Sequence, residues 1–106
     1  AVDVAVSYST QRPPRDVERA AYRVVEEAVR NAIRHSRGHL VEVTGSIDQS
    51  TIDLVVDDDG AGFGLHEPAG HHGLNSMWHR AQAVGAALQV DGTRGGHVRF
   101  RWTKPT

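Results

Sequence analysis

The chain has 106 residues, a net charge of −1 and no cysteine. This length is typical of a single domain that buries a hydrophobic core of its own. The balanced charge argues against a nucleic-acid platform, and the absence of cysteine excludes a disulfide framework and a cysteine-ligated zinc site. No run approaches the roughly 20 apolar residues of a membrane span. We therefore expect no membrane contact by this segment, and the lack of cysteine permits the cytoplasmic location that we expect for it.

The N-terminal third of the chain is expected to form a strand and then a long helix. Val2, Val4 and Val6 alternate with polar or small residues, which predicts a half-buried strand. After a proline-containing break, a helix is expected to begin with Asp16 as its cap and to end near Ser36.

The remaining elements are expected in the order strand, strand, loop, helix, strand, strand. Their expected ranges are 41–47, 51–56, 57–73, 74–84, 86–90 and 97–102. The first strand pair forms a hairpin, and Gly85 ends the helix. This order predicts an α+β fold, a two-layer α/β sandwich in which helices cover one face of a mixed sheet of about five strands.

The first helix carries polar residues beside its apolar face. At roughly 100° per residue, Glu27 and Asn31 lie one turn apart on the flank of the apolar arc, and Arg34 lies one turn further on. This position lets a carboxylate and an amide point into a cleft beside the sheet. The alternative for an isolated Asn is a local hydrogen bond. The arc itself comprises Val17, Ala21, Val24, Val25, Ala28 and Ala32.

Two glycine-rich segments follow. In Asp58-x-Gly60-x-Gly62, after an apolar strand, a carboxylate can accept a hydrogen bond from an exocyclic amine such as that of adenine. Gly70 and Gly73 lead into a helix whose free N–H groups suit a phosphate. The alternatives are a tight strand-end turn and a plain loop before a helix. Neither a P-loop nor a strand-linked GxGxxG pattern is present.

The order and spacing of these segments resemble the GHKL nucleotide-binding superfamily. Residues 22–36 look like the N box of sensor histidine kinases of the nitrate-sensor and fluidity-sensor type. Residues 73–81 look like that group's sequence after its last glycine box. The matching positions are Glu27-x-x-x-Asn31, Asp58-x-Gly60-x-Gly62, Gly70-x-x-Gly73-Leu74 and Met77-x-x-Arg80-Ala81.

The resemblance implies a Bergerat-type fold that binds ATP and Mg²⁺. It implies that Asn31 is a metal ligand and that Glu27 organises metal-bound water rather than acting as the base; these are the candidate catalytic residues. It assigns the adenine amine to Asp58. The other cofactor-binding candidates, which contact phosphates or nucleotide or shape the pocket, are Arg34, His35, Gly60, Gly62, Gly70, Gly73 and Leu74.

The resemblance also implies a histidine kinase domain, residues 1–106, excised from a longer protein. Such a domain presents Mg-ATP to a histidine in a separate dimerisation domain, which also serves a response regulator, so the fragment is expected to be inactive alone. The parent is expected to be a homodimer, either anchored in a membrane or soluble. Two features depart from the family pattern: the lid, residues 63–73, is very short, and Gly95-Gly96-His97 lacks the usual Thr.

Three other readings stay open at this point. A serine-kinase anti-sigma factor shares the same boxes, although residues 77–81 favour the histidine kinase. A pseudo-kinase would bind nucleotide only to regulate a partner. A metal-binding module would gather imidazoles in a zinc site, although the histidines have no regular ligand spacing. These histidines are His66, His71, His72, His79 and His97.

Overall fold

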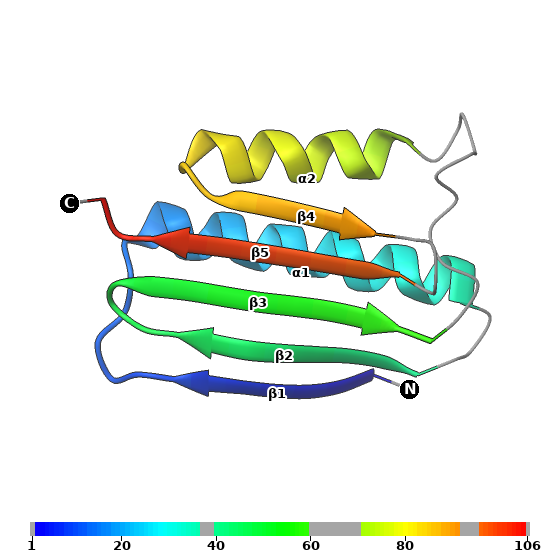
Figure 1. The fold of residues 1–106 in the computed structure, drawn as a ribbon, viewed down its shortest axis with the longest axis horizontal. Helices are drawn as coiled ribbons and strands as arrows, with labels where there is room; N and C mark the ends of the chain where they lie inside the picture. Colours follow the sequence, from blue (N-terminus) through cyan, green and yellow to red (C-terminus); the bar gives the residue numbers. More distant parts are fainter. Residues whose placement is uncertain (1, 37–39, 60–70, 92–95, 106) are drawn as a thin grey trace.

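The structure is a computed structural model that describes residues 2–36, 40–59, 71–91 and 96–105 (Figure 1). Within these ranges the chain forms five strands and two helices, which confirms the expected α+β sandwich. In chain order they are β1 (Val2–Tyr8), α1 (Arg15–Ser36), β2 (Val41–Ile47), β3 (Thr51–Asp58), α2 (His71–Ala83), β4 (Ala87–Asp91) and β5 (His97–Thr103).

The strands form one mixed sheet in the order β1-β2-β3-β5-β4. The β1–β2 pair is parallel, because α1 connects the two strands, whereas the other pairs are antiparallel. Both helices lie on the same face of the sheet (Figure 1). Helix α1 packs on β3, β5 and β2, and α2 packs on α1 and β4. Strand β1 is therefore an edge strand beside the helix layer.

Local hydrogen bonds fix the turns that were expected from the sequence. In the β2–β3 hairpin, Asp48 Oδ1 accepts from the N–H groups of Ser50 at 2.8 Å and Thr51 at 2.7 Å. After α2, the Ala86 N–H donates to the Ala81 carbonyl at 2.9 Å, and Gly85 takes a φ of 72°. This is the Schellman arrangement, and it confirms that Gly85 ends the helix.

Helix α1 begins two residues earlier than a cap at Asp16 implies. The Glu18 N–H donates to the Pro14 carbonyl at 3.0 Å, so the first helical residue is Arg15. Asp16 therefore lies inside the first turn instead of capping the helix. Its carboxylate still stands near the positive end of the helix dipole.

The core lies between the sheet and α1. The arc expected on α1 is buried apart from Val25, which is half-buried, and Ala20 joins it. Facing residues come from alternate positions of the strands, as the period of two requires. The largest fully buried side chains are Phe100, Ile52, Met77, Val24, Val41, Val56 and Val98.

Strand β1 is far more exposed than its alternating valines indicated. Val2 is 42% exposed and Val4 is 66% exposed, and only Val6 packs partly against the core. The expectation of a half-buried strand was wrong because the helix layer of the described structure does not extend over this edge of the sheet. Among the described helices, none is long and apolar enough to cross a membrane.

Candidate functional site

Two polar side chains are buried among the described residues, and both are residues that the sequence pattern marked. Asn31 on α1 is 8% exposed, and Asp58 at the end of β3 is 9% exposed. Burying a polar group costs free energy unless hydrogen bonds compensate it. A fold that keeps an amide and a carboxylate at its apolar core boundary therefore points to a binding role for them.

Asp58 owes its burial to the extension of β3. Residues 57 and 58 were expected to be loop, but the strand continues through both of them. The inward-facing positions of β3 thus run Ile52, Leu54, Val56 and Asp58, so the carboxylate continues the core face of the strand. The Asp58 N–H donates to the Gly96 carbonyl at 2.9 Å, which ties this position to the start of β5.

Asn31 differs from Asp58 in its partners. Its side chain has no hydrogen-bond partner among the residues that the structure describes. The local hydrogen bond considered as an alternative is therefore not seen within this part of the chain. Leaving a buried amide without hydrogen bonds costs about 1–3 kcal/mol of folding free energy. A ligand that forms a hydrogen bond with the amide recovers that cost.

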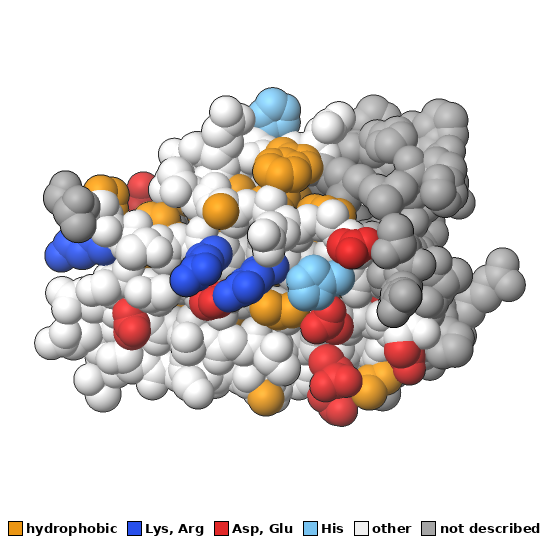
Figure 2. All heavy atoms as spheres, viewed as in Figure 1, with side chains coloured by type: hydrophobic (Ala, Val, Ile, Leu, Met, Phe, Trp, Pro, Cys, Tyr) orange, Lys and Arg blue, Asp and Glu red, His pale blue; other side chains and the backbone are white. Residues whose placement is uncertain are grey.

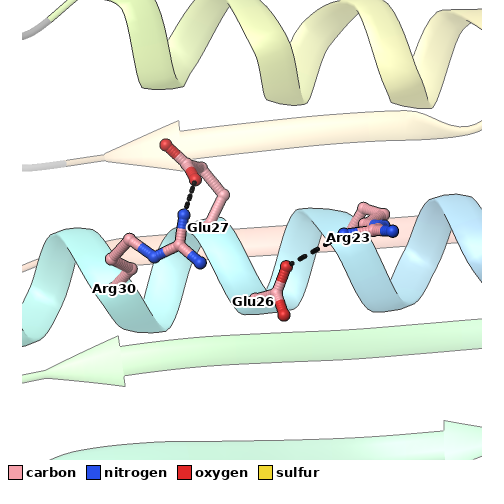
Figure 3. A network of polar contacts seen from close by, with 4 residues as sticks. All are labelled: Arg23, Glu26, Glu27 and Arg30. Atoms are coloured by element: carbon pink, nitrogen blue, oxygen red, sulfur yellow. Dashed lines mark hydrogen bonds and ion pairs between the residues drawn. The ribbon is translucent and has the colours of Figure 1, made fainter.

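Glu27 lies on the side of α1 that faces α2, as Figure 3 shows. Its side chain is half-buried, and its closest described cation is Arg30, whose Nη1 lies 3.5 Å from Glu27 Oε2. That contact is long and its Arg30 partner is exposed, so it leaves the carboxylate available. Glu26 points away from α2, and Arg23 contacts it at 3.5 Å (Figure 3). The Arg30 contact is one that the helical pattern of residues i and i+3 could have revealed.

Asn31 and Asp58 lie on elements whose ends meet on one side of the molecule. The C-terminal ends of α1 and β3 and the N-terminal ends of β5 and α2 lie on the same side in Figure 1. Helix α1 contacts both β3 and α2. Arg34 is exposed on the last turns of α1, and the backbone of His35 follows it there.

The glycine-rich segments lie partly outside the described residues. Gly73 and Leu74 fall in the first turn of α2, which begins at His71, three residues earlier than expected, and carries no acidic residue. The positive end of this helix is therefore not neutralised within its first turn. Gly60, Gly62 and Gly70, together with most of the short lid, lie outside the described residues.

The available donor set fits a magnesium ion that arrives with a nucleotide. No group of three or more His, Asp or Glu side chains within the described ranges is arranged to hold a metal ion. Mg²⁺ bound to phosphates keeps several waters and needs only one or two protein ligands. The amide of Asn31, which has no partner among the described residues, can serve as one such ligand, and the carboxylate of Glu27 can serve as a second or hold one of the waters.

Comparisons with known proteins agree with the resemblance seen in the sequence. No protein-family model matches the chain. The sensor protein NarQ homolog of Haemophilus influenzae is 37% identical over 77% of this chain and 15% of its own length. The sensor histidine kinase LiaS of Bacillus subtilis is 39% identical over 74% of this chain and 22% of its own length. The chain thus spans less than a quarter of these curated relatives.

Solved structures show the same fold. The histidine kinase domain of the blue-light activated histidine kinase of Erythrobacter litoralis EL346 aligns with a TM-score of 0.76 and 24% identity, over 96% of this chain and 54% of that one. The ATP binding domain of PrrB from Mycobacterium tuberculosis aligns with a TM-score of 0.63 and 20% identity, over 98% of this chain and 82% of that one. The chain is therefore homologous to a segment of sensor histidine kinases and has the fold of histidine kinase ATP-binding domains.

Proposed function

We propose that the chain binds ATP with Mg²⁺ at the end of the sheet where Asn31 and Asp58 are buried, and presents it for transfer to a histidine of a separate helical domain. One observation carries this proposal. The buried polar side chains of the described residues are the N-box Asn and the Asp of the DxGxG pattern, whose burial an apolar core alone does not explain.

Asp58 is assigned to the base of the nucleotide. Its carboxylate lies on the core face at the end of β3, where an exocyclic amine can donate to it. Adenine offers an amine at its six position, whereas guanine offers a carbonyl oxygen there, which a carboxylate repels. The site should therefore prefer ATP to GTP, because adenine presents a donor to this carboxylate at its six position, whereas guanine presents an acceptor there.

We assign the phosphate groups of the nucleotide to a position between α1 and the start of α2. Asn31 supplies an amide oxygen as a metal ligand, and Glu27 orients a water of the metal's shell. Arg34 is exposed nearby, and the first turn of α2 offers free N–H groups without a competing carboxylate. When bound, Mg²⁺ neutralises phosphate charge. This chain holds and orients the nucleotide, because positioning and charge neutralisation are the main requirements of phosphoryl transfer.

We assign the histidine that accepts the phosphoryl group, and the contacts with partner proteins, to domains other than this chain. We place the accepting histidine on a helical dimerisation domain, which brings two copies together and passes the phosphoryl group to a response regulator. The chain covers 15% and 22% of two kinase relatives, which leaves room for such a domain in proteins of this kind. We place the 106-residue chain in the cytoplasm.

A nucleotide titration tests the proposal directly. Isothermal calorimetry of the 106-residue chain is run with ATP and with GTP, each with Mg²⁺ and with EDTA. We expect ATP to bind more tightly with Mg²⁺ than without it, and GTP to bind weakly. Equal binding of ATP and GTP, or no binding of either, contradicts the proposal. Phosphorylation of a protein serine by this chain would instead favour the anti-sigma type of kinase.

A further inference from the structure

An apolar groove of about 670 Å³ runs between β1 and α1, on the helix-bearing face of the sheet. Val4, Val6 and Tyr8 of β1 form part of its floor, and Tyr22 and Val25 of α1 form part of its wall. Val4 and Tyr22 are 66% and 64% exposed. A small domain with large apolar side chains gathered along one groove has a surface suited to a partner.

The position of the groove decides the secondary structure of its occupant. Helices α1 and α2 cover β3, β5 and β4, whereas β1 lies beyond the helix layer (Figure 1). A segment laid over β1 meets side chains, because the backbone hydrogen-bonding groups of a strand lie in the plane of the sheet. Such a segment must satisfy its own N–H and C=O groups, which an α-helix does.

The length of the floor sets the length of that helix. Strand β1 has seven residues, which at about 3.3 Å per residue span roughly 23 Å. A helix rises about 1.5 Å per residue, so about 15 residues cover the floor from end to end. A helix of this length lying beside α1 would extend the existing helix layer over the edge of the sheet.

The charged residues beside the groove indicate which polar residues the docked helix should carry. Arg12 is paired with Glu18 at 2.8 Å, and Glu26 is contacted by an arginine of its own helix at 3.5 Å. Arg15 and Arg19 also line the groove and are exposed, and neither has a carboxylate partner within the described ranges. The groove therefore has an apolar floor with unmatched positive charge beside it, which attracts acidic side chains.

We propose that this groove is the docking site for an amphipathic helix of a partner protein, with acidic residues flanking its apolar stripe. The groove is distinct from the candidate nucleotide site. Glu26 lines it, whereas the next residue, Glu27, points in a different direction, toward α2 (Figure 3). Docking and nucleotide binding can consequently fail independently of each other.

The test uses a synthetic helical peptide of about 15 residues with a leucine stripe flanked by glutamates. It is titrated into the ¹⁵N-labelled chain, and amide shifts are followed by NMR. We expect the shift changes to map to β1 and to the groove side of α1. A peptide with lysines in place of the glutamates should bind about tenfold more weakly.

Charge reversal on the protein supplies the matched comparison. The R15E/R19E variant should prefer the lysine peptide, whereas R101E/K104E, which changes two exposed cations away from the groove, should keep the original preference. Val4→Asp should abolish binding of both peptides without unfolding the chain, because Val4 is already exposed.

Several results would overturn the proposal. The first is that R15E/R19E still prefers the glutamate peptide to the lysine peptide. The second is that the amide shift changes are confined to surfaces other than β1 and the groove side of α1. A third is self-association of the chain that Val4→Asp disrupts, which would assign the groove to a second copy. A fourth is stronger binding of an extended, non-helical version of the peptide along the free edge of β1.

Discussion

Arg99 on β5 forms two hydrogen bonds with Asp53 on β3. Its Nε donates to Asp53 Oδ1 at 2.9 Å, and its Nη2 donates to Oδ2 at 2.6 Å. The pair lies on the sheet face opposite the helices, where charged side chains gather (Figure 2). The hydrogen bonds from Arg99 lower the pKa of the Asp53 carboxyl below its ordinary value of 3.8, and the nearby charges of Arg99 and Arg101 act in the same direction.

The first prediction concerns acid stability. Because the pKa of Asp53 is lower in the folded chain than in the unfolded chain, the pair stabilises the fold fully above pH 3.8 and loses its effect as the pH falls through the lowered pKa. Asp53→Asn should therefore be less stable than the original chain at pH 6, and this difference should shrink at lower pH. Urea unfolding at a series of pH values measures it. A difference that stays constant down to pH 2 would exclude the ion pair as its cause.

The second prediction concerns Gly45 in the middle of β2. Its φ is 142°, and a Cβ built on it would lie 1.9 Å from the carbonyl oxygen of Asp53 on β3. Gly45→Ala should therefore force the strands apart and destabilise the fold by about 2–4 kcal/mol. Gly85→Ala is the control, since its φ of 72° costs only about 1–2 kcal/mol and nothing lies within 4 Å of its added Cβ. Thermal unfolding should rank the two variants in that order.

The chain's elements could be predicted because each has a local signal. The hairpin follows from Asp48, whose carboxylate binds the turn amides, and the end of α2 follows from Gly85. Asn31 and Glu27 were found on the flank of α1 because helical periodicity is strong over 22 residues. These features depend on neighbours in sequence, so they needed no knowledge of the tertiary fold.

Features that depend on distant contacts could not be predicted in the same way. The strand order β1-β2-β3-β5-β4 and the exposure of Val4 follow from where α1 lies on the sheet, which no local pattern encodes. The burial of Asp58 depends on β3 continuing to pair with β2 and β5 beyond its apolar run. Three adjacent aspartates favour a loop in isolation, and the neighbouring strands override that preference.

The third prediction concerns selectivity for the base. Asp58→Asn removes the charge from the proposed acceptor, so ATP affinity should fall by about 1.5–3 kcal/mol, roughly ten- to a hundredfold. The preference for ATP over GTP should narrow, because an amide can also donate to the oxygen of guanine. Asp57→Asn is the matched control, since Asp57 pairs with His97 on the other face of the sheet. Competition calorimetry compares them, and unchanged ATP affinity in folded Asp58→Asn would remove this residue from the site.

The fourth prediction concerns the metal. Asn31→Ala should abolish the increase in ATP affinity that Mg²⁺ gives, while leaving the weaker metal-free binding. Since the Asn31 side chain has no partner among the described residues, its loss should cost little stability. Gln82→Ala, an exposed change on α2, should preserve the magnesium effect. If Asn31→Ala responds to Mg²⁺ like the original chain, another residue holds the ion.

The last prediction separates nucleotide binding from phosphoryl transfer. The chain should bind Mg-ATP without phosphorylating itself, because proximity is the main resource of this chemistry and the accepting histidine belongs to another domain. The chain has seven histidines. Of the two whose side chains the structure describes, His79 is exposed on α2, and His97 faces away from the helix layer, opposite to Asp58.

The assay incubates the chain with γ-labelled ATP and Mg²⁺ and resolves the products on a gel. We expect no label on the chain alone, and acid-labile label on a histidine-bearing helical domain of a sensor histidine kinase when that domain is added. Asn31→Ala should abolish this transfer, because it removes the proposed metal ligand without removing the acceptor. Stoichiometric acid-labile label on the chain alone would show that one of its own histidines reaches the phosphate, and replacing each of the seven histidines in turn would identify which one.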